Sequence, residues 1–169
     1  KTGASKVFVE DLRHEFITEY LWPLVRSGAR YEGAYLLGTA IAQPLLAKRT
    51  IDIALEEGAD AVAHGCTGKS NDQVRFEIAL RTLAPELAIL APVRDEGFSR
   101  QHEADYLRRL GIEVSAERAA YSVNRGLWGV TIGGKETLTS TGSIADHAWV
   151  LSKNAFTDPE AATSHTIGF

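Results

Sequence analysis

The polar residues best suited to chemistry are gathered in residues 64–77, which read HGCTGKSNDQVRFE. Asn71, Asp72 and Arg75 can share one helix face, because Arg75 lies four residues after Asn71 and three residues after Asp72. A carboxylate at the positive end of a helix can hold an ammonium, and an arginine can grip a carboxylate with two hydrogen bonds. This set suits a zwitterionic amino acid. An ordinary helix cap with an ion pair fits the spacing equally well.

Other site chemistries fit this sequence less well. Gly68-Lys69-Ser70 resembles the end of a phosphate-binding loop, but the first glycine of that motif is replaced by Ala63. His14-Glu15 begins like a zinc-binding helix, yet Thr18 stands where the second histidine is needed. Cys66 close to His64 has no orienting acid and is best interpreted as a small residue packed in a turn. We therefore expect neither a catalytic nucleophile nor a protein metal site.

The elements around this stretch follow a β-then-α order. Apolar residues predict strands over 59–63 and 87–91, with the polar turn and a helix ended by Pro85 between them. Upstream, alternation predicts a strand over 6–10, followed by a helix that Asp11 caps and that kinks or ends near Pro23.

Further helices and strands are predicted on both sides of this unit. A Gly-punctuated loop over 31–39 leads into a helix that Gly58 ends, with Pro44 in its first turns. A later helix ends at Gly111, and 112–114 is expected to form a short strand. Beyond Tyr121, glycines, serines and threonines predict an irregular, loop-rich stretch, with strand-like residues at 149–151 and 164–169.

This order predicts an α/β fold with a Rossmann-like parallel sheet and right-handed crossovers. We expect an incomplete nucleotide-binding domain over residues 1–115 and a linker with the beginning of a second α+β domain over 116–169. Because the chain opens on Lys1 and has no methionine, we also expect it to lack preceding elements.

Composition restricts the partners. A net charge of −4 argues against nucleic acid, and no apolar run approaches the roughly 20 residues that span a bilayer. A single cysteine rules out an internal disulfide framework and fits a reducing, cytoplasmic setting. Small molecules are the expected ligands.

Residues 64–77 closely resemble the long signature of argininosuccinate synthases, with Ser70 where that family usually has glycine. The segments 31–39, 91–94 and 121–129 follow in the family's order. The resemblance implies a fold of the ATP-pyrophosphatase (adenine nucleotide alpha hydrolase-like) type. It also implies ATP-dependent ligation of citrulline to aspartate through citrullyl-AMP, with Mg²⁺-ATP as a substrate complex, in a homotetramer.

The resemblance also implies roles for individual residues. The residues expected to contact ligands are Gly65 for ATP, then Thr67, Asn71 and Asp72 for aspartate, and finally Tyr35, Asn71, Arg75, Ser122 and Thr131 for citrulline.

The sequence also departs from the family's pattern. Ala40 replaces a serine, Gln43 an arginine, Asn124 an aspartate and Gly126 an asparagine. The family's Ser-Gly-Gly-Leu-Asp-Thr-Ser pyrophosphate loop and its C-terminal half, with the helix that forms the oligomer, are not found in these 169 residues. We therefore expect the isolated chain to be inactive. A non-catalytic, divergent or truncated paralogue that serves as a binding or assembly module is the alternative, and a tRNA-modifying enzyme fits the acidic charge poorly.

Overall fold

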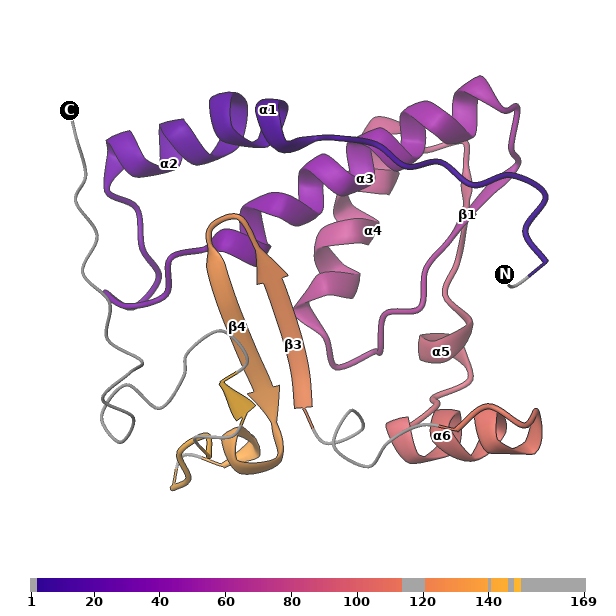
Figure 1. The fold of residues 1–169 in the computed structure, drawn as a ribbon. Helices are drawn as coiled ribbons and strands as arrows, with labels where there is room; N and C mark the ends of the chain where they lie inside the picture. The colour runs from indigo at the N-terminus through magenta and orange to yellow at the C-terminus, as the bar shows by residue number, and fades with distance from the viewer. Residues whose placement is uncertain (1–2, 114–120, 140, 146–147, 150–169) are drawn as a thin grey trace. The chain divides into compact units, whose positions relative to one another are not determined.

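The structure is a computed structural model that describes residues 3–113, 121–139, 141–145 and 148–149. The described residues fall into two compact units, one within 1–99 together with 126–129 and the other within 100–125 and from 130 onward. Figure 1 shows the elements of both units. None of the helices in this part of the chain has the length and apolar character needed to cross a membrane.

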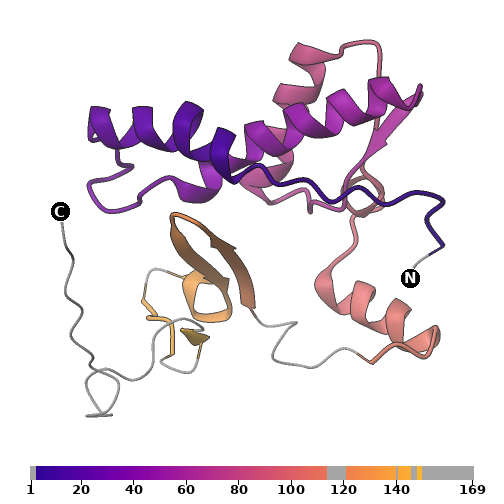
Figure 2. The ribbon, with the colours of Figure 1, turned by 45° about the horizontal axis from the view of Figure 1, so that its top comes forward.

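The first unit opens with one helical segment of changing pitch: α1 (Arg13–Glu15), a π-helical stretch η1 (Phe16–Leu21) and α2 (Trp22–Ser27). Asp11 was predicted to cap this helix, but the N-cap residue is Leu12; Asp11 lies one residue earlier and accepts a hydrogen bond from the backbone nitrogen of Arg13 at 3.1 Å. The helix neither ends nor breaks at Pro23. Proline has no N–H to donate, and the widened π turn lies directly before it. The stretch η1 contacts α3, and Figure 2 shows both elements.

The prediction of a strand over residues 6–10 is wrong. These residues have extended backbone without a sheet partner, and Val7 and Val9 are 78% and 92% exposed. A strand requires backbone hydrogen bonds from a neighbour. Alternating residue types predicted the extended shape, but no partner strand stands beside it among the described residues.

The loop over 31–37 and the helix that follows it agree with the prediction. Tyr31 and Tyr35 exchange two backbone hydrogen bonds of 2.9 and 3.0 Å, which closes the loop on itself. Helix α3 (Gly38–Glu56) begins after Leu37 and contains Pro44 in its second turn. Gly58, with φ of 65°, reverses the chain after the helix.

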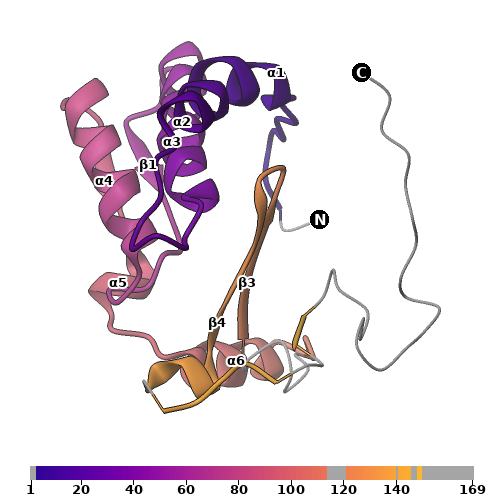
Figure 3. The same ribbon diagram turned by 90° about the vertical axis from the view of Figure 1, so that its left-hand side faces the viewer.

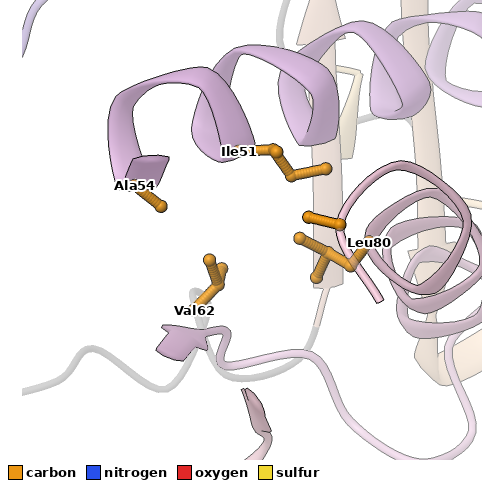
Figure 4. Packing of buried hydrophobic residues seen from close by; sticks show 5 residues of the cluster. Ile51, Ala54, Val62 and Leu80 are labelled. Carbon is orange, nitrogen blue, oxygen red and sulfur yellow. The ribbon is translucent and has the colours of Figure 1, made fainter. Parts of the chain in front are cut away.

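The predicted strand–turn–helix–strand unit is confirmed. Strands β1 (Ala61–Ala63) and β2 (Ala88–Leu90) are parallel, with Val62 opposite Ile89, and α4 (Asn71–Leu83) connects them. Figure 4 shows Ile51 and Ala54 of α3 meeting Val62 and Leu80. The two helices thus share a core with the sheet, which fixes the direction in which β1 delivers the chain to the polar turn.

Two shorter helices follow β2. Helix α5 (Pro92–Asp95) occupies the turn expected at Pro92, and α6 (Arg100–Arg109) is the helix expected to end at Gly111, whose φ is 76°. Residues 112 and 113 do not form the predicted strand, and residue 114 lies outside the described residues.

The prediction of an irregular, loop-rich stretch beyond Tyr121 is wrong over residues 121–134. Strands β3 (Tyr121–Gly126) and β4 (Gly129–Gly134) pair in an antiparallel hairpin, and η2 (Lys135–Leu138) follows as a 3₁₀ turn. The glycines that suggested irregular structure stand at the strand ends, and Gly129 has a φ of 98° that suits a tight turn. Trp149 is exposed outside any strand, while 150–151 and 164–169 lie outside the described residues.

Candidate amino-acid site at the carboxyl end of β1

The polar turn begins where the sheet ends. The backbone nitrogen of His64 donates to the carbonyl of Leu90 at 3.0 Å, which continues the β1–β2 ladder by one bond. The nitrogen of Ser70 donates to the carbonyl of Thr67 at 3.0 Å and closes the turn. The Ser70 hydroxyl then accepts from the nitrogen of Asp72 at 3.0 Å, so Ser70 is the N-cap of α4. The turn is therefore anchored at both ends.

The first two turns of α4 carry the residues expected to bind amino acids. Arg75 donates from Nη1 to Oδ1 of Asp72 at 3.1 Å, and the two side chains are 27% and 25% exposed. Asn71 is exposed at the first helical position. The common face predicted for Asn71, Asp72 and Arg75 is thus confirmed for Asp72 and Arg75. The ion pair is also what an ordinary helix cap would show, so the pairing alone does not distinguish the two interpretations.

The turn residues leave room for a ligand. Gly65 is exposed, and a Cβ added to it would meet no atom within 4 Å. Thr67 is half-buried, between Gly65 and the start of the helix. Backbone N–H groups at the beginning of a helix attract negative charge. A carboxylate or phosphate brought to this turn would therefore meet favourable electrostatics.

Cys66 and His64 do not form a nucleophile and base. The nitrogen of Cys66 donates to Nδ1 of His64 at 3.3 Å, and the imidazole stacks on Phe76 with the ring centres 6.2 Å apart. Burial raises the pKa of the Cys66 thiol, and the nearby Asp72 carboxylate adds to the rise. Burial lowers the pKa of His64, and Arg94 lowers it further. A protonated thiol beside a neutral imidazole agrees with the interpretation of Cys66 as a packing residue.

Arg94 belongs to the surroundings of the turn, although no role was predicted for it from the sequence. It lies on α5 and donates to Oε1 of Gln73 at 3.0 Å, while forming an ion pair with Glu77. Figure 3 shows α5 below the amino end of α4. Two signals in the sequence could have pointed to Arg94. It stands shortly after a strand end, where ligand sites of α/β sheets gather, and it belongs to the segment 91–94 that resembles the family.

The remaining predicted citrulline residues come from other elements. Tyr35 is half-buried in the loop before α3, in the same unit as α4. Ser122 on β3 and Thr131 on β4 are half-buried in the second unit. The structure brings Thr67, Asn71, Asp72 and Arg75 onto one turn and helix, and the joining of the other three to them stays a prediction.

The departures from the family's pattern lie on two elements. Ala40 and Gln43 are half-buried on α3, and Oε1 of Gln43 is buried without a hydrogen-bond partner among the described residues. Asn124 and Gly126 lie on β3. In the described part of the chain, no three His, Cys, Asp or Glu side chains gather as a metal site would require.

A parallel strand–turn–helix–strand unit with a polar turn at the strand's carboxyl end defines a Rossmann-like, ligand-binding class of α/β domain. The family model described as "Arginosuccinate synthase N-terminal HUP domain" matches residues 1–113. The chain therefore belongs to the argininosuccinate synthase family.

Curated relatives agree with this family. The chain is 47% identical to an argininosuccinate synthase of Roseiflexus sp. (strain RS-1), in a match that covers 99% of this chain and 42% of the relative. The same identity holds for that of Koribacter versatilis (strain Ellin345), with 100% and 42% covered. The argininosuccinate synthase of Acetivibrio thermocellus is 55% identical over 76% of this chain and 32% of its own length. The chain thus spans about 42% of the length of the first two relatives.

Proposed function

We propose that this chain provides the amino-acid half of the site of an argininosuccinate synthase, which joins citrulline to aspartate at the expense of ATP. The observation that supports this most directly is the match of the family model to residues 1–113, within which Thr67, Asn71, Asp72 and Arg75 stand together on the polar turn and the first turns of α4. In this proposal the citrulline ureido oxygen attacks the α-phosphate of ATP and releases pyrophosphate. The aspartate amine then attacks the citrullyl carbon and releases AMP.

The residues of the turn act by positioning. Asp72 accepts hydrogen bonds from the aspartate ammonium, and Thr67 and Asn71 fix its carboxylates. Arg75, with Tyr35, Ser122, Thr131 and Asn71, holds citrulline. Gly65 lets ATP approach the backbone, because no side chain stands there. Orienting two reactants in this way lowers the entropic part of the barrier without a protein nucleophile.

ATP enters as a substrate with Mg²⁺. We propose that the ion is held chiefly by the phosphates, as Mg²⁺ usually is when it enters with a nucleotide. Mg²⁺ supplies charge neutralisation at the phosphates, and this chain's own contribution is the turn with its N–H groups.

Finer features of the family belong to the same proposal. We propose an ATP-pyrophosphatase-type nucleotide-binding domain over residues 1–115 and the start of a second domain over 116–169. We also propose that the protein forms a homotetramer, is located in the cytoplasm and has no nucleic-acid partner. The β1–β2 parallel sheet supports the first of these features.

A binding or assembly module without catalysis is the second candidate. It is favoured by Ala40, which has no hydroxyl for citrulline, and by Gln43, whose buried Oε1 is unpaired among the described residues. Loss of one hydroxyl contact weakens binding by roughly 0.5–1.5 kcal/mol, which corresponds to about two- to twelvefold in Kd.

Calorimetric titration of the 169-residue chain separates the two candidates. The proposal predicts heat of binding with L-aspartate and with citrulline, and far weaker binding of succinate, which lacks the ammonium that Asp72 would hold. A folded chain that binds neither amino acid would favour the assembly module. Binding of succinate as tightly as aspartate would contradict the role of Asp72.

A further inference from the structure

Arg94 of α5 has three polar partners, and two of them, Gln73 and Glu77, lie on α4. Its Nε donates to Oδ1 of Asp95 at 2.8 Å, its Nη1 donates to Oε1 of Gln73 at 3.0 Å, and it forms an ion pair with Glu77. The side chains of Arg94 and Glu77 are 27% and 16% exposed. The planar guanidinium can reach three acceptors at once, which a lysine ammonium on its flexible stem does less well.

The stem of the same side chain packs against the ligand-facing turn. A Cβ added to Gly68 would lie 3.2 Å from Cγ of Arg94, closer than ordinary van der Waals contact. Gly68 does not have a left-handed φ, so the closeness of Arg94, and not the backbone conformation, is what disfavours a side chain there. Because three partners hold the guanidinium, the stem cannot move aside cheaply.

We propose that Arg94 is a positioning residue of the aspartate site. It holds the turn over residues 65–69 against the amino end of α4, so that Thr67 and Asn71 point to a common ligand. The inference rests on the proposed function for its ligand, but its effect on the turn is independent of that ligand. Arg94 itself acts through the turn and is not proposed to touch substrate.

The test compares Arg94→Gln and Arg94→Lys with a matched control, Arg81→Gln. Arg81 pairs with the same Glu77 from the next turn of α4, at 68% exposure and away from the polar turn. Three readouts are measured on the 169-residue chain: the midpoint of urea unfolding, amide hydrogen exchange over residues 65–69, and the Kd for L-aspartate.

Arg94→Gln is expected to raise the amide exchange rates in the turn about tenfold and to raise the Kd for L-aspartate about tenfold. Both changes correspond to the loss of one charge-assisted contact. Arg81→Gln is expected to change neither by more than about twofold. Arg94→Lys retains the charge opposite Glu77 and is expected to restore the urea midpoint, but not the exchange rates or the Kd. That split separates positioning of the turn from a general contribution to stability.

Gly68→Ala perturbs the same contact without removing a charge. It is expected to speed exchange in the turn, and the double variant with Arg94→Gln is expected to be no worse than Arg94→Gln alone. Fully additive effects would overturn the inference.

The inference is also overturned if Arg94→Gln leaves exchange in the turn unchanged, or if it speeds exchange while the aspartate Kd stays within twofold. It is equally overturned if Arg94→Lys restores all three readouts together. If the unaltered chain binds no aspartate, the proposed function fails, and the exchange measurements alone then decide whether Arg94 holds the turn.

Discussion

Asp72→Asn removes the charge that the account assigns to the aspartate ammonium while keeping nearly the same shape. Two native interactions of Asp72 are lost. Its part-buried ion pair with Arg75 contributes about 0.3–1 kcal/mol, and its place in the first turn of α4 contributes about 0.3–1 kcal/mol through the helix dipole. The free energy of unfolding should therefore fall by only about 0.6–2 kcal/mol. Urea unfolding followed by circular dichroism measures this change.

The effect on ligand binding should be larger. A hydrogen bond to a charged group contributes about 1.5–3 kcal/mol, which predicts a 10- to 150-fold increase in the Kd for L-aspartate. Citrulline affinity should hold or improve, because Arg75 no longer has an internal carboxylate competing for it. Calorimetry with both amino acids measures the two effects in the same sample.

The control is Asp105→Asn on α6, where Asp105 and Arg108 form an ion pair of the same i, i+3 spacing outside the proposed site. It should leave both amino-acid Kd values unchanged. The reasoning is refuted if Asp72→Asn binds aspartate within about twofold of the unaltered chain, or if Asp105→Asn weakens binding equally.

Four further outcomes are expected. Leu80→Ala should lower the free energy of unfolding by about 2–5 kcal/mol, because Leu80 is 1% exposed in the core. Leu83→Ala, on the exposed side of α4, should lower it far less, and thermal unfolding of the two variants measures the difference. Ser70→Ala should cost about 1 kcal/mol and Ser70→Gly only a few tenths, since glycine is a tolerated N-cap, and equal losses in urea unfolding would contradict the cap. Alkylation of Cys66 near neutral pH should be slower in the folded chain than in urea, because burial raises the thiol pKa, and equal rates would exclude that cause. Burial lowers the pKa of His64 below 6.5 in the folded chain, so the stability that its neutral form contributes is complete above that pH and is lost as the pH falls. The free energy of unfolding should therefore fall more between pH 7.5 and 5.5 in the unaltered chain than in His64→Asn, and equal falls would contradict this cause.

The sequence predicted those elements whose partners lie close along the chain. Strands β1 and β2 and helix α4 bury their apolar residues against one another and against α3, so apolar periodicity and Pro85 were sufficient signals. The strand expected over residues 6–10 failed because a strand also needs a partner, which local alternation does not reveal.

The β3–β4 hairpin was missed because its strands were not recognised in the sequence. Its glycines suggested irregular loop, whereas Gly126 and Gly129 end the two strands at a tight turn and the cross-strand pairing is not visible in composition.

Within the site, spacing predicted the shared face of Asp72 and Arg75, because it depends on one helix alone. The role of Arg94 could not be predicted in this way. Its contacts with Gln73 and Glu77 join residues 21 and 17 positions apart, and they arise only when β2 returns the chain beside α4. Ser122 and Thr131 were assigned by resemblance, and their citrulline contacts stay predictions.

The most direct test of the central claim is a nuclear magnetic resonance titration of the ¹⁵N-labelled 169-residue chain with L-aspartate. The account predicts saturable shifts that are largest at the backbone amides of Thr67, Asn71 and Asp72 and small along α6. Shifts spread over α6, or no saturable shift in the turn at millimolar aspartate, would contradict the assignment of an amino-acid site to this turn and helix.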